Sequence, residues 1–246
     1  MARRGTVGAL LGSGLVAIAA LGGAGGYGVG LLTAVDGSAA AVGTAAPLGT
    51  VRPSTPSPAA TPTEKPRKVV PDKSAPLDAD ELRYKTRRFT VQDVYRSEVS
   101  ARVPANWNET QPDPPRTSRF TDPTGKRWLR IEAGFTIQRA PAASMAARIA
   151  ELNRLPKDQM IKYLANTVEG KYATLAYTYV PPKALAPVAT LRYVIVRWVA
   201  DDSGLCAVEM SSTGLPQDKE ALLAVLDKAS ETVVRRDSPL ESEQPS

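Results

Sequence analysis

The sequence predicts an α+β domain, an antiparallel sheet flanked by helices, that is preceded by a membrane-spanning helix and a disordered stalk. Three observations predict this arrangement. Residues 1–35 are apolar with almost no charge, and residues 36–82 are rich in Pro, Ala, Ser and Thr. Residues 83–236 carry short strand-like runs, tight turns and two helical patterns, whereas residues 237–246 are polar and are expected to form a disordered tail.

The N-terminal segment is long enough to cross a bilayer. Its uncharged run, from Gly5 to Val35, exceeds the roughly 20 residues that a spanning helix needs. Two arginines precede the run and Asp36 follows it, a charge order that places the N-terminus in the cytoplasm. We therefore expect a single-pass protein of the cell membrane, held by residues 8–35, with its C-terminal domain extracellular.

The sequence leaves open whether this segment is cleaved. The small residues at 38–41 (Ser-Ala-Ala-Ala) would suit a signal peptidase, so secretion after signal cleavage is the alternative. The apolar run is longer than that of a typical secretory signal, which favours an uncleaved signal anchor. The stalk that follows, residues 36–82, has no apolar periodicity and cannot bury enough surface to fold alone.

The first clear element of the domain is a hairpin at 118–137. Residues 122–125 (Asp-Pro-Thr-Gly) are typical of a turn and lie between two strand-like runs. In the second run, Leu129 and Ile131 alternate with more polar neighbours, and this period of two places one face of the strand on a core.

A helical pattern follows the hairpin. Pro141 begins it, as proline often does in a first helical turn, and a second apolar group follows Pro156. The apolar residues at helical spacing are Met145, Ile149, Leu152, Met160, Ile161 and Leu164. They predict two short helices or one broken helix.

The rest of the domain alternates strands with a helix. Strand-like runs follow at 172–180, 190–200 and 205–211. Residues 201–204 (Asp-Asp-Ser-Gly) form a tight link that makes the last two an antiparallel hairpin. The run at 191–199 is apolar on both faces, as expected of a central strand covered on both sides. A helix that begins at Pro216 and a last strand at 232–235 complete the domain.

Three stretches of this domain resemble a known fold. They are Val103–Trp107 (VPANW), Arg119–Leu129 (RFTDPTGKRWL), and Pro216 with Leu226 and Asp227. Together they resemble the Mog1/PsbP-like fold of actinobacterial cell-envelope proteins, and the chain is similar to LpqN-type lipoproteins and to the extracellular domains of some bacterial serine/threonine kinases. The resemblance implies a sheet flanked by helices that binds or scaffolds, with no shared catalytic residues. The chain departs from the lipoproteins by lacking an anchor Cys, and from the kinases by lacking a kinase domain.

The composition removes most catalytic devices. The chain has no His, the usual general base near neutral pH, and its only Cys, Cys206, cannot form an intrachain disulfide. The adjacent carboxyls of Asp201 and Asp202 are interpreted as turn formers. We therefore expect that the protein is not an enzyme, and we assign no catalytic residue, no metal ligand and no cofactor.

The domain carries an excess of positive charge. Residues 83–236 include 24 Lys and Arg against 16 Asp and Glu, a net charge of +8. An anionic partner would suit this field, although such charge also simply solvates a surface. Tryptophans stack on sugars or lie at membrane interfaces, or else close a core. The candidate contacts with a ligand or an anionic surface are Arg87, Arg88, Trp107, Lys126, Arg127 and Trp128.

The sequence favours a membrane-tethered extracytoplasmic binding or accessory domain that recognises a cell-envelope component or a partner protein without catalysis. Besides the membrane, the expected partners are an envelope protein, an anionic lipid or a wall polymer, and no nucleic acid. Two alternatives stay open. One is a His-free hydrolase or transferase of the envelope with its site between sheet and helix, and the other is a structural spacer or assembly protein.

Overall fold

The computed structural model describes residues 67–112, 115–135 and 139–240. These residues belong to one compact unit, Pro62–Ser246. The predicted membrane-spanning segment and the first part of the predicted stalk lie outside the described residues. Among the helices in the described ranges, none combines the length and the apolar character needed to cross a membrane.

The larger of two sheets is antiparallel and has seven strands within the described residues. In spatial order, its strands are β3 (Asn108–Thr110), β4 (Thr117–Thr121), β5 (Trp128–Glu132), β9 (Cys206–Gly214), β8 (Arg192–Ala200), β7 (Tyr172–Tyr179) and β6 (Lys162–Glu169). Both hairpins predicted from their turn residues are present, as β4–β5 and β8–β9. The predicted central strand is also confirmed, because β8 lies between β7 and β9 and most of its residues are buried.

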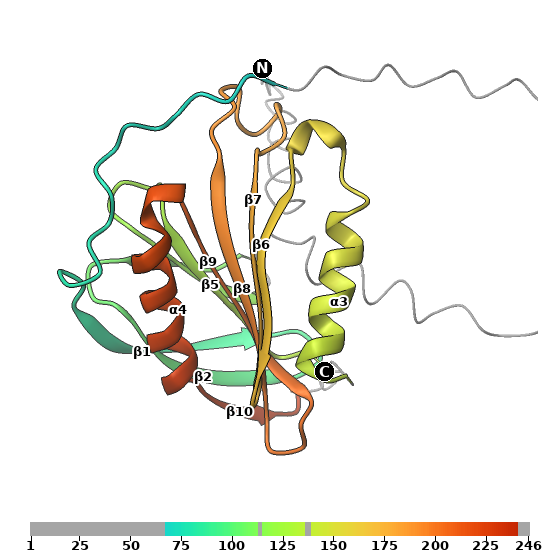
Figure 1. Cartoon of the computed structure of the whole chain (residues 1–246). Coiled ribbons are helices and arrows are strands. Elements are labelled where there is room, and N and C mark those ends of the chain that lie inside the picture. The colour runs from blue at the N-terminus through green and yellow to red at the C-terminus, as the bar shows by residue number, and fades with distance from the viewer. Residues whose placement is uncertain (1–66, 113–114, 136–138, 241–246) are drawn as a thin grey trace, which may run out of the picture. The chain divides into compact units, whose positions relative to one another are not determined.

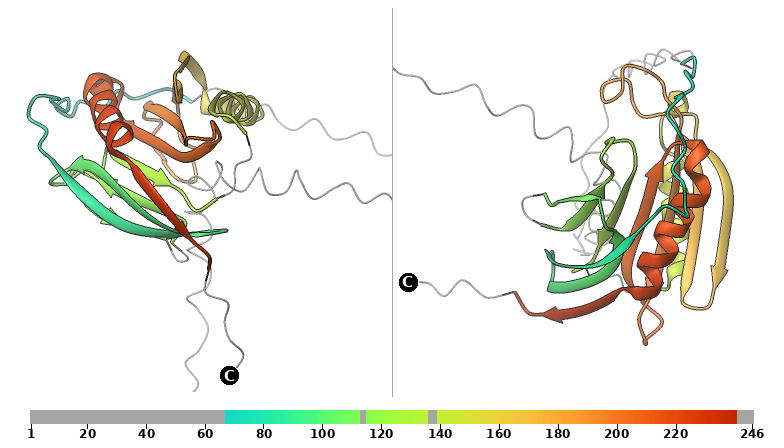
Figure 2. Two further views of the ribbon diagram at one scale, coloured as in Figure 1. Left: turned by 90° about the horizontal axis from the view of Figure 1, so that it is seen from below. Right: turned by 90° about the vertical axis from the view of Figure 1, so that its left-hand side faces the viewer.

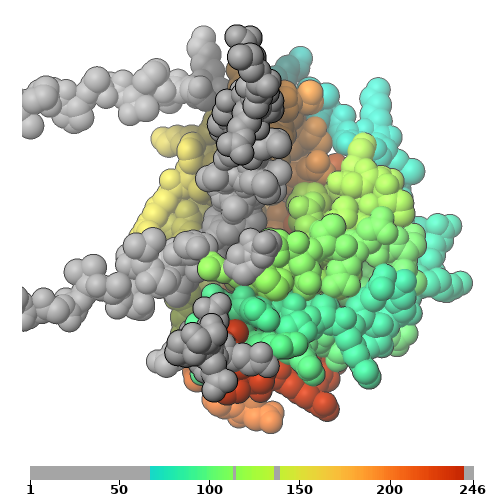
Figure 3. All heavy atoms as spheres, turned by 180° about the vertical axis from the view of Figure 1, so that it is seen from behind, coloured from blue at the N-terminus to red at the C-terminus, as the bar shows by residue number. Residues whose placement is uncertain are grey.

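A smaller sheet lies against one face of the larger one. Its strands, in spatial order, are β1 (Tyr84–Gln92), β2 (Arg96–Pro104) and β10 (Val234–Ser238). The helices are α3 (Pro141–Leu152), α4 (Lys219–Thr232) and the short 3₁₀ helices η1 (Lys157–Gln159) and η2 (Pro216–Asp218). Figure 3 shows the side of the molecule where the hairpin β4–β5 lies beside β1 and β2.

The two long helices cover opposite faces of the larger sheet (Figures 1 and 2). Helix α4 packs with β2, β8 and β9, and its buried residues join the larger core cluster together with the smaller sheet. Helix α3 packs on β7 and β8 and belongs to a second cluster around Leu175, Val196 and Trp198. The predicted class, an antiparallel sheet flanked by helices, is therefore confirmed for the described residues.

The sequence explains why both helices form and which face each buries. Pro141 occupies the first turn of α3, where its missing N–H costs nothing, and Met145 lies on the buried side. In α4 the buried stripe predicted from the sequence, which includes Leu222, Val225 and Leu226, is fully enclosed. Burying such a side chain contributes about 1.5–3 kcal/mol, so this stripe fixes α4 on the sheet.

The helical expectation beyond Pro156 is wrong. Met160 ends η1 with a positive φ of 51°, a left-handed conformation that an α-helix cannot continue. The chain then forms the edge strand β6, paired with β7. Because all eight residues of β6 are exposed, no hydropathy pattern marks the strand, and the apolar residues Ile161 and Leu164 were spaced like a helix by coincidence.

The last part of the predicted stalk contacts the domain. Residues 67–82, named here the docked segment, run beside α4 (Figure 1) without helix or strand. The guanidinium of Arg67 donates hydrogen bonds to the carbonyls of Pro181, Ala186 and Pro187. The side chains of Leu77 and Leu82 pack against the larger core cluster. The contacts of the domain thus extend N-terminal to residue 83, and at the other end Asp237 and Ser238 complete β10.

Candidate functional site

The structure does not bring the six sequence-predicted contact residues together. Arg87 and Arg88 lie on β1, where Arg88 is exposed and Arg87 half-buried. Trp107 is only 1% exposed and packs in the larger core cluster, so it is a core residue and not a surface platform. Lys126, Arg127 and Trp128 are adjacent in the β4–β5 hairpin, but the ion-pair and ring partners of their side chains differ.

Arg127 is a buried structural cation, which corrects its assignment as a surface contact. It is 4% exposed, and its Nε and Nη2 donate to the two carboxylate oxygens of Asp218 at 2.8 and 2.9 Å. Its Nη1 lies 3.3 Å from Asp122 Oδ2, and Nη2 also donates to the carbonyl of Ala75 at 2.6 Å. The hydrogen bonds that Arg127 donates to Asp218 raise the pKa of Arg127. The charge of Arg127 is therefore neutralised inside the protein by Asp122 and Asp218.

Lys126 faces the docked segment. Its ammonium donates to both carboxylate oxygens of Asp72 at 2.8 and 3.0 Å and to the hydroxyl of Ser74. The hydrogen bonds from Lys126 and Ser74 lower the pKa of Asp72. This contact ties the hairpin to the docked segment, so the Lys126 ammonium is already paired.

Trp128 belongs to a cluster on the α3 side of the larger sheet. We name this cluster the arginine patch; its members are Arg119 on β4, Trp128 on β5, Tyr179 on β7 and Arg192 on β8. The guanidinium carbon of Arg119 lies 4.3 Å from the centre of the Trp128 ring, and that of Arg192 lies 5.8 Å from it. Both distances are within the range of a cation–π contact. Trp128 therefore holds two guanidinium groups near one another.

The patch holds two cations without an acidic partner. No carboxylate of the described residues forms an ion pair with Arg119 or Arg192, and the Nε of Arg119 is buried without a hydrogen-bond partner. Arg192 donates from Nη1 to the carbonyl of Lys126 at 3.1 Å. Burial lowers the pKa of Arg119, and the charge of Arg192 lowers it further. A guanidinium keeps its positive charge in proteins, so a bound anion would relieve the repulsion between these two cations.

A second polar cluster lies on the same face, between the sheet and α3. Glu132 and Glu209 are directly opposite on β5 and β9. Arg130 contacts both carboxylates, and Arg148 of α3 donates to Glu209 Oε1 at 2.7 Å. Trp198 Nε1 donates to the other oxygen of Glu209 at 2.8 Å. Burial raises the pKa of Glu132. Unlike the arginine patch, this cluster balances its own charges.

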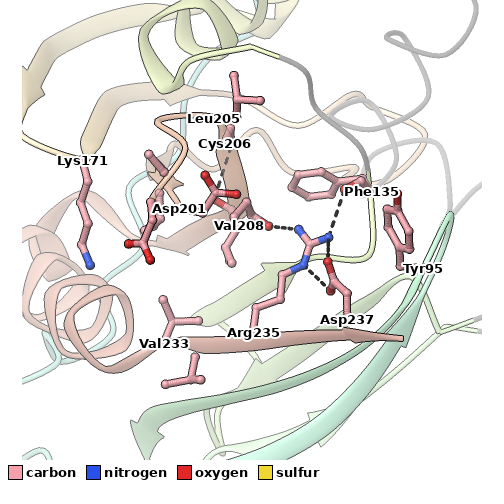
Figure 4. Close-up of a pocket in the computed structure, with 15 residues that line it drawn as sticks. Tyr95, Phe135, Lys171, Asp201, Leu205, Cys206, Val208, Val233, Arg235 and Asp237 are labelled. Atoms are coloured by element: carbon pink, nitrogen blue, oxygen red, sulfur yellow. Dashed lines mark hydrogen bonds and ion pairs between the residues drawn. The ribbon is translucent and has the colours of Figure 1, made fainter. Parts of the chain in front are cut away.

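A cavity of about 570 Å³ lies between the β8–β9 turn and β10, and Figure 4 shows the residues that line it. Arg235 lies at its centre, but its donors are already used by Asp237 at 2.7 and 2.8 Å and by the carbonyls of Ala207 and Phe135. Asp201, at the rim, accepts from the N–H of Ser203 at 2.9 Å and acts as the turn former that the sequence predicts. The polar groups here join strands to one another, and they occupy four of the five N–H donors of the arginine.

Sequence reasoning found Trp128 but missed Arg119, Tyr179 and Arg192. Arg119 lies two residues before the end of β4, and Arg192 opens the apolar run of β8. Only the spatial order β4-β5-β9-β8 brings them to one ring. The available signal was the half-polar alternation of β4, in which Arg119 and Thr121 share a face away from the buried Phe120.

No protein-family profile matches this sequence, and no curated protein matches it. Structural comparison finds the Ran-binding protein Mog1p of Saccharomyces cerevisiae, with 12% identity and a TM-score of 0.44, covering 63% of this chain and 96% of that one. A point mutant of protein Mog1 matches with 12% identity and a TM-score of 0.41, covering 60% and 95%. LpqN of Mycobacterium tuberculosis, described as involved in cell envelope biogenesis, matches with 15% identity and a TM-score of 0.34, covering 61% and 91%. Both names to which the sequence resemblance points, Mog1 and LpqN, are among these structures, whereas the likeness to kinase ectodomains stays a prediction.

Proposed function

We propose that this protein is a membrane-tethered, extracytoplasmic accessory domain that binds an anionic group of a cell-envelope component at the arginine patch, without catalysis. One observation carries the proposal. Arg119 and Arg192 lie together over Trp128, and no carboxylate of the described residues pairs with either. Two further half-buried arginines of this face, Arg130 and Arg148, each contact a glutamate.

The geometry of the patch suits an oxyanion. A guanidinium presents its N–H groups as a planar fork that matches a carboxylate or a phosphate with two parallel hydrogen bonds. The cation–π contact with Trp128 restrains the guanidinium of Arg119, so less side-chain freedom is lost when the fork binds. Burial raises the pKa of the Tyr179 phenol, so its hydroxyl stays protonated and can donate to the same anion.

The desolvation cost of Arg119 favours a ligand-binding role over a purely structural one. A half-buried cation costs desolvation free energy that a carboxylate partner normally offsets. Arg127 shows this arrangement in the same hairpin, with Asp122 and Asp218 against its guanidinium. Because Arg119 lacks such a partner, a bound anion would supply the missing compensation. The net charge of +8 over residues 83–236 would attract that anion from a distance.

The envelope location rests on the sequence. The uncharged run before residue 36, with arginines ahead of it, would place the domain outside the membrane, where anionic lipid headgroups and wall polymers are the abundant oxyanions. Protease treatment of intact cells that carry a C-terminal epitope tag would test this location. A protected, cytosolic tag would overturn it.

The binding site can be tested with the compact unit, Pro62–Ser246. Intrinsic tryptophan fluorescence is a suitable signal, since Trp128 is half-buried whereas Trp107 and Trp198 are enclosed. The ligands are inorganic phosphate, vesicles of phosphatidylglycerol and, as a neutral reference, vesicles of phosphatidylcholine. We expect saturable binding to at least one of the two anionic probes and none to phosphatidylcholine.

The variants locate the site. Arg119→Ala and Arg192→Ala should each weaken binding at least tenfold, because charge-assisted hydrogen bonds contribute about 1.5–3 kcal/mol each. Arg154→Ala removes an exposed arginine beyond the end of α3 and should leave the dissociation constant unchanged. Absence of binding to both anionic probes, or equal losses in all three variants, would overturn the proposal.

The second candidate function is a His-free hydrolase or transferase, and the Glu132–Glu209 pair favours it. The two carboxyls lie directly opposite each other on β5 and β9, burial raises the pKa of Glu132, and Glu209 lies against Arg148, so the two groups have different surroundings, as an acid–base pair requires. Turnover of an envelope substrate that is lost in both Glu132→Gln and Glu209→Gln, but kept in Arg119→Ala, would establish this function and remove the non-catalytic one.

A further inference from the structure

The edges of the two sheets differ in how well they are protected against pairing. Edge strands usually carry charges, prolines or a short length that prevents association. β3 has three residues, and β1 and β10 each carry three charged residues. β6 is eight residues long, and its only charged residues, Lys162 and Glu169, stand at its two ends.

The centre of β6 has the composition of a pairing strand. Its six central residues are uncharged and contain neither Pro nor Gly, and Tyr163, Thr167 and Val168 favour extended backbone. Every residue of the strand is exposed, with Leu164 at 47% and Val168 at 56%. On the side away from β7, the backbone N–H and C=O groups of β6 have no neighbouring strand among the described residues.

The pairing of β6 with β7 assigns each residue to one face of the sheet. Tyr163 and Val168 are opposite Tyr177 and Ala173, which belong to the core cluster under α3. Lys162 and Glu169 therefore point to the α4 side. The register shift between Tyr163 and Ala165 leaves Leu164 without a partner, and this bulge lets Tyr163 and Val168 share a face although they are five residues apart.

We propose that two copies of this chain associate through their β6 strands, antiparallel, around a two-fold axis at Asn166. Opposite residues in an antiparallel pair must point to the same face. With Leu164 in the bulge of each strand, one register meets this condition over the whole strand. It places Asn166 opposite its own copy, Ala165 opposite Thr167, Tyr163 opposite Val168 and Lys162 opposite Glu169.

The charges of the strand support a second copy as the occupant. In this register both ends of the pair bring an ammonium opposite a carboxylate, and both apolar pairs join Tyr163 to Val168. A strand with like charges at its two ends would repel its own copy in any antiparallel arrangement. Pairs of opposite charge directly across two strands are stabilising, and like charges there are destabilising.

Charge reversal tests the register on the full chain in a mild detergent, with the dimer fraction measured by sedimentation over a range of concentrations. Lys162→Glu and Glu169→Lys each turn two attractive pairs into two repulsive ones, so each should raise the dimer dissociation constant roughly tenfold. The double variant K162E/E169K restores opposite charges at both ends and should return the constant to that of the original chain. Lys157→Glu, a charge reversal outside β6, should not change it.

Cross-linking tests the position of the two-fold axis. A cysteine at 166 would lie directly opposite its own copy, whereas the only native thiol, Cys206, is buried. Asn166→Cys should give a disulfide-linked dimer under mild oxidation, and Thr167→Cys, whose opposite residue is Ala165, should give several-fold less. A monomer at all concentrations, a dimer indifferent to both single reversals, or a double variant that fails to recover would each overturn the proposal. So would equal cross-linking at 166 and 167, which would indicate a different interface.

Discussion

Removing Arg127 is the most informative perturbation of the folded domain. The guanidinium neutralises two carboxylates, those of Asp122 and Asp218, which are 4% and 0% exposed. It also holds the docked segment through the carbonyl of Ala75, while Asp218 Oδ1 accepts from the N–H of Leu77. The variant Arg127→Met keeps much of the aliphatic stem and removes the charge.

The expected loss follows from what the substitution leaves behind. Breaking a buried ion pair by removing one partner typically costs about 3–5 kcal/mol, because an uncompensated charge stays in the interior. For a unit of this size, such a loss lowers the melting temperature by on the order of 10 °C. Removing both partners should cost less than the sum of the single changes, so R127M/D218N should be more stable than the two separate losses predict.

The assay is denaturant unfolding of Pro62–Ser246, followed at several pH values. Burial alone would raise the pKa of Asp122, but hydrogen bonds from Thr124, Arg127 and Lys126 lower it. A lowered pKa contributes stability that is present above the unfolded value of about 3.9 and is lost as pH falls through the folded value. In Arg127→Met, protonation removes the charges of the two unpaired carboxylates and so lowers the cost of burying them. The difference in unfolding free energy between the variant and the original protein should therefore shrink as the pH is lowered toward about 4.

Two results would refute this reasoning. One is a loss below about 1 kcal/mol at neutral pH, which would place the guanidinium in solvent. The other is a difference that stays constant between pH 7 and pH 4, which would mean that packing and not charge accounts for the loss. The control Arg154→Ala, at an exposed position, should change stability by less than about 0.5 kcal/mol.

Three further outcomes are expected. Burial raises the pKa of the Cys206 thiol to about 12, so a thiol reagent at pH 8 should label it only after unfolding, and stoichiometric labelling of the native protein would contradict its position. Gly134→Ala should cost about 1–3 kcal/mol in denaturation, because φ is +85° and a Cβ would lie 3.0 Å from the carbonyl oxygen of Tyr95, whereas Gly125→Ala, at φ +71° with open space, should cost about 1 kcal/mol. Arg119→Met should change the unfolding free energy by less than about 1 kcal/mol, since it loses a stacking contact but also a cation without a carboxylate partner, and a loss above about 2 kcal/mol would indicate a structural role.

The sequence predicted those elements that have one buried face. In β5, Leu129 and Ile131 are fully buried between half-exposed neighbours, so the sequence shows the period of two that is typical of a strand. The buried face of α4 could be recognised in the sequence for the same reason. β6 was missed because an edge strand exposed on both sides has no such alternation, and because the left-handed backbone at Met160, which ends the preceding turn, is not encoded by any glycine.

The candidate site was only half predictable, because its members are far apart in the chain. Trp128 was found as an aromatic residue beside a basic turn, but Arg192 lies 64 positions later and reaches it only through the order of four strands. The same limit explains the error at Arg127. Its partner Asp218 is 91 residues away, so local charge suggested an exposed cation where the fold supplies a buried counter-ion.

The composition of the docked segment does not predict that the segment contacts the domain. One of these contacts also links the segment to the arginine patch. Residues 67–82 are too polar and too rich in Pro to fold alone, yet the domain offers them partners such as Lys126, which binds Asp72. The carbonyl of Lys126 accepts the hydrogen bond of Arg192 at 3.1 Å. One residue of the β4–β5 turn therefore touches the docked segment with its side chain and the arginine patch with its backbone. The attachment of the segment and the position of Arg192 depend on the same turn.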